Sequence, residues 1–229
     1  MSRTQRELKA LRQQQRAEAA ARQRARDRRN LMIIAGTLVV VAVAIFGVAS
    51  YLNHLAQQQA ASRLAFSTAP GTCLASGSGP CIGTKVADEG RTHIDVSTTS
   101  PYATHPPTSG PHYNAQGIAP VAWQTIATLQ EGQYIHNLEH GGIVILYNCS
   151  SGNDCTTLQQ QLKNYVQNLA PVEPRFGEVK MVMTPYSQGM QKKVALLAWD
   201  YIQFLDGYDQ NAITRFYENH VDQGPEQIA

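Results

Sequence analysis

The feature that most constrains this chain is an uncharged, largely apolar segment, LMIIAGTLVVVAVAIFGVASYL, from Leu31 to Leu52. About twenty such residues, rising about 1.5 Å each, form a helix long enough to cross the hydrocarbon core of a bilayer. Residues 1–29 carry ten basic and three acidic residues, a net charge of +7, whereas the remainder carries nine basic and fourteen acidic residues, a net charge of −5. The positive-inside rule then places residues 1–30 in the cytoplasm and residues 53–229 outside. We therefore expect a single-pass protein of the cell membrane.

A cleavable signal peptide is the alternative interpretation of this segment. The apolar region of a signal peptide is usually shorter, and its basic region rarely reaches roughly thirty residues. We expect a retained anchor for this reason. The lipid bilayer is then the first predicted partner of the chain.

The basic N-terminal segment is rich in Ala, Gln, Glu and Arg, and Thr4-x-x-Glu7 resembles a capping box, so we expect a helix. Its charge favours contact with anionic lipid head groups. A docking helix for a cytoplasmic partner is the second interpretation, and no nucleic-acid partner is expected.

Four cysteines follow the apolar segment: Cys73, Cys81, Cys149 and Cys155. Close pairs of cysteines in an oxidising compartment indicate disulfides. The favoured bonds are Cys73–Cys81 and Cys149–Cys155, and two other pairings stay open. Neither pair has CxxC spacing, which argues against a zinc knuckle. Ligation of a soft metal by cysteine is the remaining alternative.

Regular secondary structure becomes legible after Pro120, beyond a segment dense in Gly, Pro, Ser and Thr. The expected elements are two strands within Gln133–Tyr147 that meet at Gly141-Gly142, a helix from Leu158 to about Leu169, strands at 179–183 and 194–199, and a helix capped by Asp209. This order predicts an α+β fold, a small mixed sheet with packed helices, preceded by a single transmembrane helix and a cytoplasmic basic helix. The predicted organisation is a cytoplasmic segment 1–30, a transmembrane helix 31–52, a linker with a disulfide loop 53–84, and an extracytoplasmic domain 85–229.

The segment His136-Asn137-Leu138-Glu139-His140 carries the clearest chemistry in the chain. Histidine and carboxylate side chains bind zinc, copper or iron, and histidine moves protons near neutral pH. The letters also match the HxxEH pattern of the inverzincin metalloproteases, in which a helix carries the motif and glutamate is the general base. Because Gly141-Gly142 and a β-rich run follow directly, we expect strands here. On a strand Glu139 would point away from the histidines, whereas on a helix it would share their face. A buried polar network at a tight turn is the alternative without a metal.

The other histidines differ in their surroundings. The loop Pro106–Tyr113 is stiffened by proline and presents His112, and His93 begins a short alternating stretch. We expect His105 to be solvated, His54 to mark the membrane interface, and His220 to be a core histidine. Met181 and Met183 share a face of a strand, where core packing is favoured over a copper site.

Together these segments resemble a family of bacterial, single-anchor, extracytoplasmic proteins that carry a domain of unknown function. The resemblance covers residues 85–227 and rests on five ordered motifs: Glu89–His93, Pro106–His112, His136–Gly141, Ala198-Trp199 and Gly224-Pro225-Glu226. It implies no substrate or reaction. It groups four histidines, His93, His112, His136 and His140, within its motifs, gives Glu226 no role, and leaves the cysteines outside its pattern.

The resulting hypothesis is a divalent metal or copper ion bound by His112, His136 and His140. His93 is the candidate fourth ligand, and Glu139 is a ligand or orients one. A metal-free module that contacts an envelope protein is the second hypothesis, and a zinc-dependent hydrolase is the third. The sequence does not decide whether the protein is an enzyme.

Overall fold

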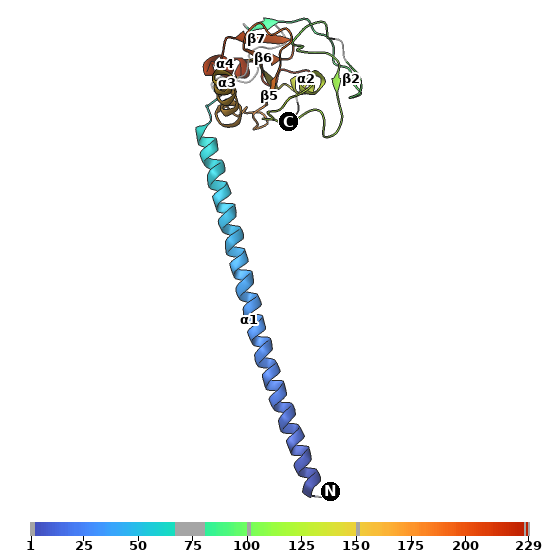
Figure 1. Ribbon diagram of the computed structural model, residues 1–229, viewed down its shortest axis with the longest axis vertical. Coiled ribbons are helices and arrows are strands. Elements are labelled where there is room, and N and C mark those ends of the chain that lie inside the picture. The colour runs from blue at the N-terminus through green and yellow to red at the C-terminus, as the bar shows by residue number, and fades with distance from the viewer. Residues whose placement is uncertain (1–2, 67–80, 100–101, 150–151, 227, 229) are drawn as a thin grey trace. The chain divides into compact units, whose positions relative to one another are not determined.

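The computed structural model describes residues 3–66, 81–99, 102–149, 152–226 and 228 (Figure 1). The chain divides into two compact units, Met1–Gln58 and Gln59–Ala229. The described residues of the first unit belong to the long helix α1 (Arg3–Ser62), and all other helices and strands belong to the second unit.

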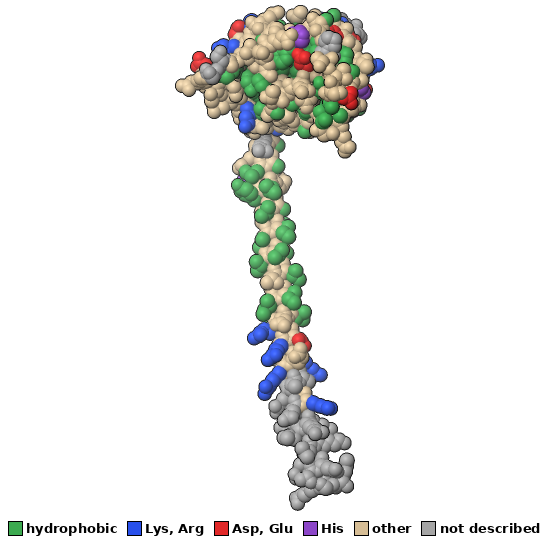
Figure 2. Space-filling model, turned by 45° about the vertical axis from the view of Figure 1, so that its right-hand side comes forward, with side chains coloured by type: hydrophobic (Ala, Val, Ile, Leu, Met, Phe, Trp, Pro, Cys, Tyr) green, Lys and Arg blue, Asp and Glu red, His purple; other side chains and the backbone are tan. Residues whose placement is uncertain are grey.

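Helix α1 exposes its apolar side chains throughout residues 31–52, as Figure 2 shows. The exposed fraction reaches 75% at Phe46, so no described part of the protein covers these side chains. Within the described residues, Arg22–Ser62 is the one helix long and apolar enough to cross a membrane. By length and composition it fits a membrane span or a signal sequence.

The second unit is built on a mixed sheet of five strands in the order β1-β7-β6-β4-β5. Strands β4 and β5 are parallel, and the other neighbouring pairs are antiparallel. The strands are β1 (Thr84–Lys85), β4 (Ile143–Tyr147), β5 (Met181–Pro185), β6 (Val194–Ala198) and β7 (Tyr201–Leu205). A separate parallel pair joins β2 (His93–Ile94) to β3 (His112–Tyr113). The predicted α+β class with a small mixed sheet is thus confirmed.

Both faces of the sheet are covered. Helix α3 (Asn153–Asn164), its π-helical extension η1 (Tyr165–Leu169) and helix α4 (Gln210–His220) pack on one face, and α2 (Glu131–Glu139) packs on the other (Figure 1). Side chains alternate between the faces, so Ile143 and Ile145 join the first layer of the core while Val144 and Leu146 join the second. Burial on both faces explains why these strands read as unbroken apolar runs.

The elements after β4 largely match their predictions. Asp209 caps α4, because its carboxylate accepts a hydrogen bond from the Ala212 N–H at 2.9 Å. Met181 and Met183 lie in the core, as expected. Helix α3 begins at Asn153, earlier than predicted, and the half-buried strand β7 was not anticipated.

The two strands predicted within Gln133–Tyr147 are partly wrong, because the first of them is helix α2. The Gly-Gly pair ends this helix instead of joining two strands. The Gly142 N–H donates to the Asn137 carbonyl and the Gly141 N–H to the Leu138 carbonyl, both at 2.9 Å, which is the Schellman arrangement. Gly141 has a φ of +76°, a value that favours glycine.

Some residues before β2 also belong to the compact unit. The Leu64 N–H donates to the Leu169 carbonyl at 2.8 Å, and Leu64 and Phe66 pack against the core. The disulfide Cys149–Cys155 is present. In the predicted Cys73–Cys81 bond, Cys73 lies outside the described residues.

Candidate metal centre

The short parallel pair β2–β3 brings His93 and His112 together. The two residues are register partners, and their ring centroids lie 4.9 Å apart. The His112 N–H donates to the Thr92 carbonyl at 3.0 Å, and the Gly110 N–H to the Gly90 carbonyl at 2.7 Å. Pairing between these two motifs therefore fixes the separation of the two imidazoles.

Helix α2 supplies two further candidate ligands of the cluster. His136 and Glu139 are three residues apart and share a helical face. Glu139 Oε2 lies 2.7 Å from His112 Nε2 and 3.5 Å from His93 Nε2. The candidate ligand atoms of His93, His112, His136 and Glu139 all lie within 4.8 Å of one another. The strand expected for this segment is wrong, and on the helix Glu139 lies with the histidines, where it is placed as a candidate ligand.

Backbone carbonyls orient two of these imidazoles. His112 Nδ1 lies 2.9 Å from the Gly110 carbonyl oxygen, and His136 Nδ1 lies 2.5 Å from the Tyr113 carbonyl oxygen. A carbonyl only accepts, so Nδ1 of each imidazole donates to it, and Nε2 of each ring is the nitrogen left to face the cluster. Second partners of this kind fix the tautomer and orientation of metal-binding histidines.

The cluster is buried on one side and open on the other. His112, His136 and Glu139 are buried, whereas the side chain of His93 is 42% exposed. Burial lowers the pKa of His136, and burial followed by the neighbouring His136 lowers the pKa of His140 to about 4. These two imidazoles are therefore neutral at pH 7 and hold lone pairs for a cation.

The distances within the cluster suit a small cation. Zn²⁺ binds nitrogen and oxygen ligands at about 2.0–2.2 Å, so tetrahedral ligand atoms lie about 3.3–3.6 Å apart. The 3.5 Å separation of Glu139 Oε2 and His93 Nε2 lies in this range, whereas the 2.7 Å separation of Glu139 Oε2 and His112 Nε2 would have to widen by about 0.6 Å. Three imidazoles and one carboxylate therefore fit zinc and related transition metals with little movement of the side chains.

His140 ends helix α2 and faces a carboxylate that the sequence gave no role. Its Nε2 atom lies 3.1 Å from His136 Nε2 and 3.5 Å from Glu226 Oε2. Glu139, His140 and Glu226 form a second group with ligand atoms within 4.8 Å of one another. The motif Gly224-Pro225-Glu226 was the only signal in the sequence that pointed to Glu226.

The remaining histidines lie outside these two groups. His220 is a buried core residue, as expected: its Nε2 lies 2.6 Å from the Ile82 carbonyl oxygen, and burial lowers its pKa to about 4. His54 is exposed on α1. His105 is less solvated than predicted, because its Nδ1 contacts Glu131 Oε1 at 3.2 Å and Tyr186 Oη at 3.1 Å.

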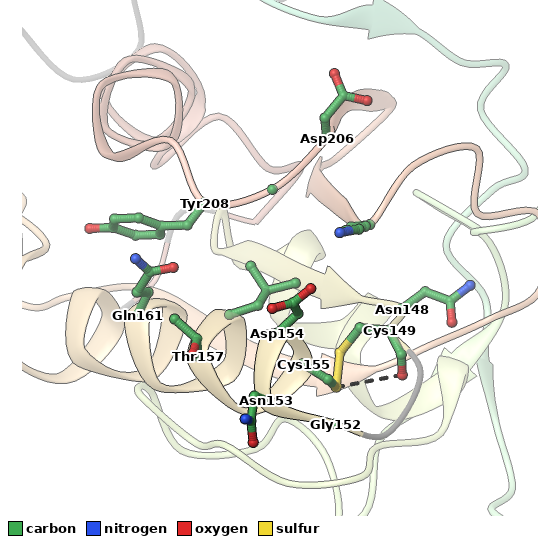
Figure 3. Close-up of a pocket in the computed structure, with 13 residues that line it drawn as sticks. Asn148, Cys149, Gly152, Asn153, Asp154, Cys155, Thr157, Gln161, Asp206 and Tyr208 are labelled. Carbon is green, nitrogen blue, oxygen red and sulfur yellow. Dashed lines mark hydrogen bonds between the residues drawn. A yellow bond between two sulfur atoms is a disulfide. The ribbon is translucent and has the colours of Figure 1, made fainter.

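A hollow of about 840 Å³ lies beside the disulfide Cys149–Cys155 (Figure 3). Asp154, Gln161 and Tyr208 line it, and none of the described residues around it is a histidine. The hollow is therefore separate from the histidine cluster and brings no further ligand to it.

Fold and cluster together define an α+β domain with a buried histidine–glutamate centre that could hold a metal ion. Residues 93–229, more than half of the chain, match the family described as "Protein of unknown function (DUF3105)", and the chain belongs to this family. The matched region begins at His93 and contains every member of both ligand groups. No curated protein and no solved structure gives a significant match.

Proposed function

We propose that this protein is a membrane-anchored, extracytoplasmic domain that binds a transition-metal ion through His93, His112, His136 and Glu139. Zinc and copper are the metals that this donor set suits first. The anchor is α1, whose apolar residues 31–52 have no protein cover among the described residues. The basic side chains before this segment favour a cytoplasmic N-terminus next to anionic lipid.

The observation that carries the proposal is the convergence of the His93, His112 and His136 imidazoles on the Glu139 carboxylate, with all candidate ligand atoms within 4.8 Å of one another. The backbone carbonyls of Gly110 and Tyr113 accept hydrogen bonds from Nδ1 of His112 and His136. The Nε2 atoms of both rings therefore face the Glu139 carboxylate, which only accepts. Acceptors that face one another in a buried space repel unless a cation or a proton lies between them.

Metal content tests the proposal directly. The full chain is purified in detergent without a polyhistidine tag, stripped with a chelator, and dialysed against Zn²⁺ or Cu²⁺. Elemental analysis then gives the number of ions bound per chain, and Co²⁺ reports the coordination geometry by its visible absorption. We expect stoichiometric metal in the wild type and its loss in His112→Gln.

The matched control is His105→Gln, because His105 also contacts a carboxylate but belongs to neither ligand group. This variant should keep its metal. A wild type that binds no metal after reconstitution, or a His112→Gln variant that binds as His105→Gln does, refutes the proposal. A metal-free result would favour the alternative function, an interaction module for an envelope protein.

A second candidate function, metal-dependent hydrolysis, is favoured by the position of HxxEH on a helix. Helix α2 places Glu139 on the side of the histidines, as that chemistry requires. The substitution Glu139→Gln separates the two roles of this carboxylate. If Glu139 is a ligand, the variant binds metal weakly; if it is a general base, the variant keeps the metal and loses turnover of ester or peptide substrates.

A further inference from the structure

We propose that a second divalent cation binds between His140 and Glu226 and shares the Glu139 carboxylate with the first, so that the centre holds two metal ions. This inference rests on the proposed function and extends it. Glu139 belongs to both ligand groups, and within each group the candidate ligand atoms lie within 4.8 Å of one another. A bridging carboxylate is a common feature of centres whose ions are about 3.5–4 Å apart.

The C-terminal segment is fixed in the position that this second site needs. The Glu226 N–H donates to the Glu139 carbonyl at 3.0 Å, and the Asp222 N–H donates to the Gly141 carbonyl at 2.9 Å. Gly224 lies so close to the end of α2 that a Cβ there would come within 2.2 Å of the Glu139 carbonyl oxygen. The segment is thus docked on the helix end and holds the side chain of Glu226 beside His140.

The buried ammonium group of Lys180 also holds the C-terminal segment in place. Lys180 is fully buried, and its Nζ donates to Asp222 Oδ1 at 2.7 Å and to the Ile228 carbonyl at 2.6 Å. These contacts lie on either side of Glu226 in the chain. Lys180 therefore fixes the backbone before and after Glu226.

His140 offers its nitrogen to this site and not to a backbone group. Its Nε2 faces His136 Nε2 at 3.1 Å and Glu226 Oε2 at 3.5 Å. Because the Tyr113 carbonyl directs the lone pair of His136 Nε2 inward, two imidazole nitrogens converge on one small space. One Nε2–H can donate to the other nitrogen at this distance, and in the metal-bound state each nitrogen would instead bind its own ion.

Charge and access also suit a second ion. Two divalent ions bring four positive charges, which Glu139 and Glu226 reduce to two, leaving the pair able to bind water, hydroxide or an anionic substrate. The side chains of His93 and Glu226 are 42% and 43% exposed, so each ion has one ligand at the surface. Ions can therefore enter from solvent without unfolding of the buried part.

The test is metal stoichiometry in the full chain in detergent, measured by equilibrium dialysis with Zn²⁺ and by electron paramagnetic resonance with Cu²⁺. We expect two ions per wild-type chain and one in Glu226→Gln. At two equivalents of Cu²⁺ the spectrum should show dipolar broadening between neighbouring ions. Broadening should vanish in Glu226→Gln. Gly224→Ala should weaken only the second ion about tenfold or more, because it displaces the segment and keeps the carboxylate.

Asp206→Asn is the control, since Asp206 is an exposed carboxylate outside both groups and should leave both ions bound. One ion per wild-type chain overturns this inference and leaves the proposed function standing. No ion at all refutes the proposed function. Two ions that Glu226→Gln does not reduce, or that give no broadening, overturn the assignment of the second site.

Discussion

The substitution Lys180→Met removes a charge from the interior while keeping a side chain of similar length. Lys180 has no exposed surface, and its Nζ lies 2.7 Å from Asp222 Oδ1, 2.6 Å from the Ile228 carbonyl oxygen and 4.0 Å from the centre of the Phe176 ring. The variant leaves Asp222 buried without its cation. Removing one partner of a buried ion pair lowers the free energy of unfolding by about 3–5 kcal/mol, because the other charge stays buried without compensation.

A second Lys–Asp pair in the same domain provides the matched control. Lys192 Nζ lies 2.9 Å from Asp206 Oδ2, nearly the same distance, but these side chains are 43% and 86% exposed. Exposed ion pairs contribute about 0–1 kcal/mol because water and salt screen them. Lys192→Met should therefore change the free energy of unfolding by about 1 kcal/mol or less.

The decrease in the free energy of unfolding caused by Lys180→Met should also depend on pH. Burial raises the pKa of Asp222 to about 6, and the neighbouring Lys180 opposes this rise while Glu173 adds to it. A carboxyl whose folded pKa lies above its unfolded value of about 3.9 stabilises the fold below that value and loses this contribution as the pH rises toward 6. Without Lys180 the pKa of Asp222 in the folded state rises further. The stabilising contribution of this carboxyl therefore continues to fall above pH 6. The difference between wild type and variant should be larger at pH 8 than at pH 5.

Urea unfolding of the full chain in detergent, followed by tryptophan fluorescence, measures this difference. The chain has two tryptophans, Trp123 and Trp199, and both lie in the C-terminal unit, so the signal reports that unit. A Lys180→Met variant no less stable than Lys192→Met at pH 8 would refute the argument. Equal differences at pH 5 and pH 8 would refute the role given to Asp222.

Further substitutions test the packing of the domain and its disulfide. Gly142→Ala places a Cβ 2.4 Å from the Trp123 ring and should lower stability by about 1–3 kcal/mol, whereas Gly207→Ala, with open space around it, should change it by less than about 0.5 kcal/mol. Leu162→Ala removes a fully buried side chain and should lower stability by about 2–5 kcal/mol in the same urea assay. Replacing Cys149 and Cys155 by serine opens a short loop and should lower the free energy of unfolding by about 2 kcal/mol, measured under non-reducing conditions against the wild type.

Local signals in the sequence predicted much of the sheet and its outer helices. The apolar run that became β4, the strand at Val194–Ala198 and the cap at Asp209 each depend on neighbouring residues alone. Strand β7 was missed because it alternates only weakly between buried and exposed residues. Its place in the sheet comes from pairing with β6, a contact that composition does not reveal.

The Gly-Gly pair at positions 141 and 142 shows how one local signal supports two structures. Glycine with positive φ is equally suited to a turn between strands and to the residue after a helix. The choice was settled by tertiary contacts. Gly132 lets the Tyr113 ring approach α2 closely, and Tyr134, Ile135 and Leu138 are fully buried on the sheet. A nine-residue helix becomes stable through such packing more than through its own propensity.

The resemblance grouped the four motif histidines, and Glu139 was named as a candidate ligand, but the contacts that bring these residues together could not be predicted. His93 meets His112 through strand pairing, and both meet Glu139 through the packing of α2 against β3. Glu226 reaches His140 only because Lys180 and Gly224 dock the C-terminal segment. Long-range contacts of this kind have no period or spacing along the chain.

The same dispersion of ligands links metal binding to folding. The candidate ligands of the two groups come from β2, β3, α2 and the C-terminal segment. These parts of the chain come together only in the folded state. An ion that binds the folded state alone stabilises it by about 2.7 kcal/mol at a free concentration of one hundred times its dissociation constant. The first ion should therefore strengthen the contact of α2 with the β2–β3 pair, and the second should strengthen the docking of the C-terminal segment. The second ion should slow hydrogen exchange at the backbone amides of Glu226 and Asp222. The first ion should slow exchange at the backbone amide of His112. Amide exchange therefore distinguishes the two binding events.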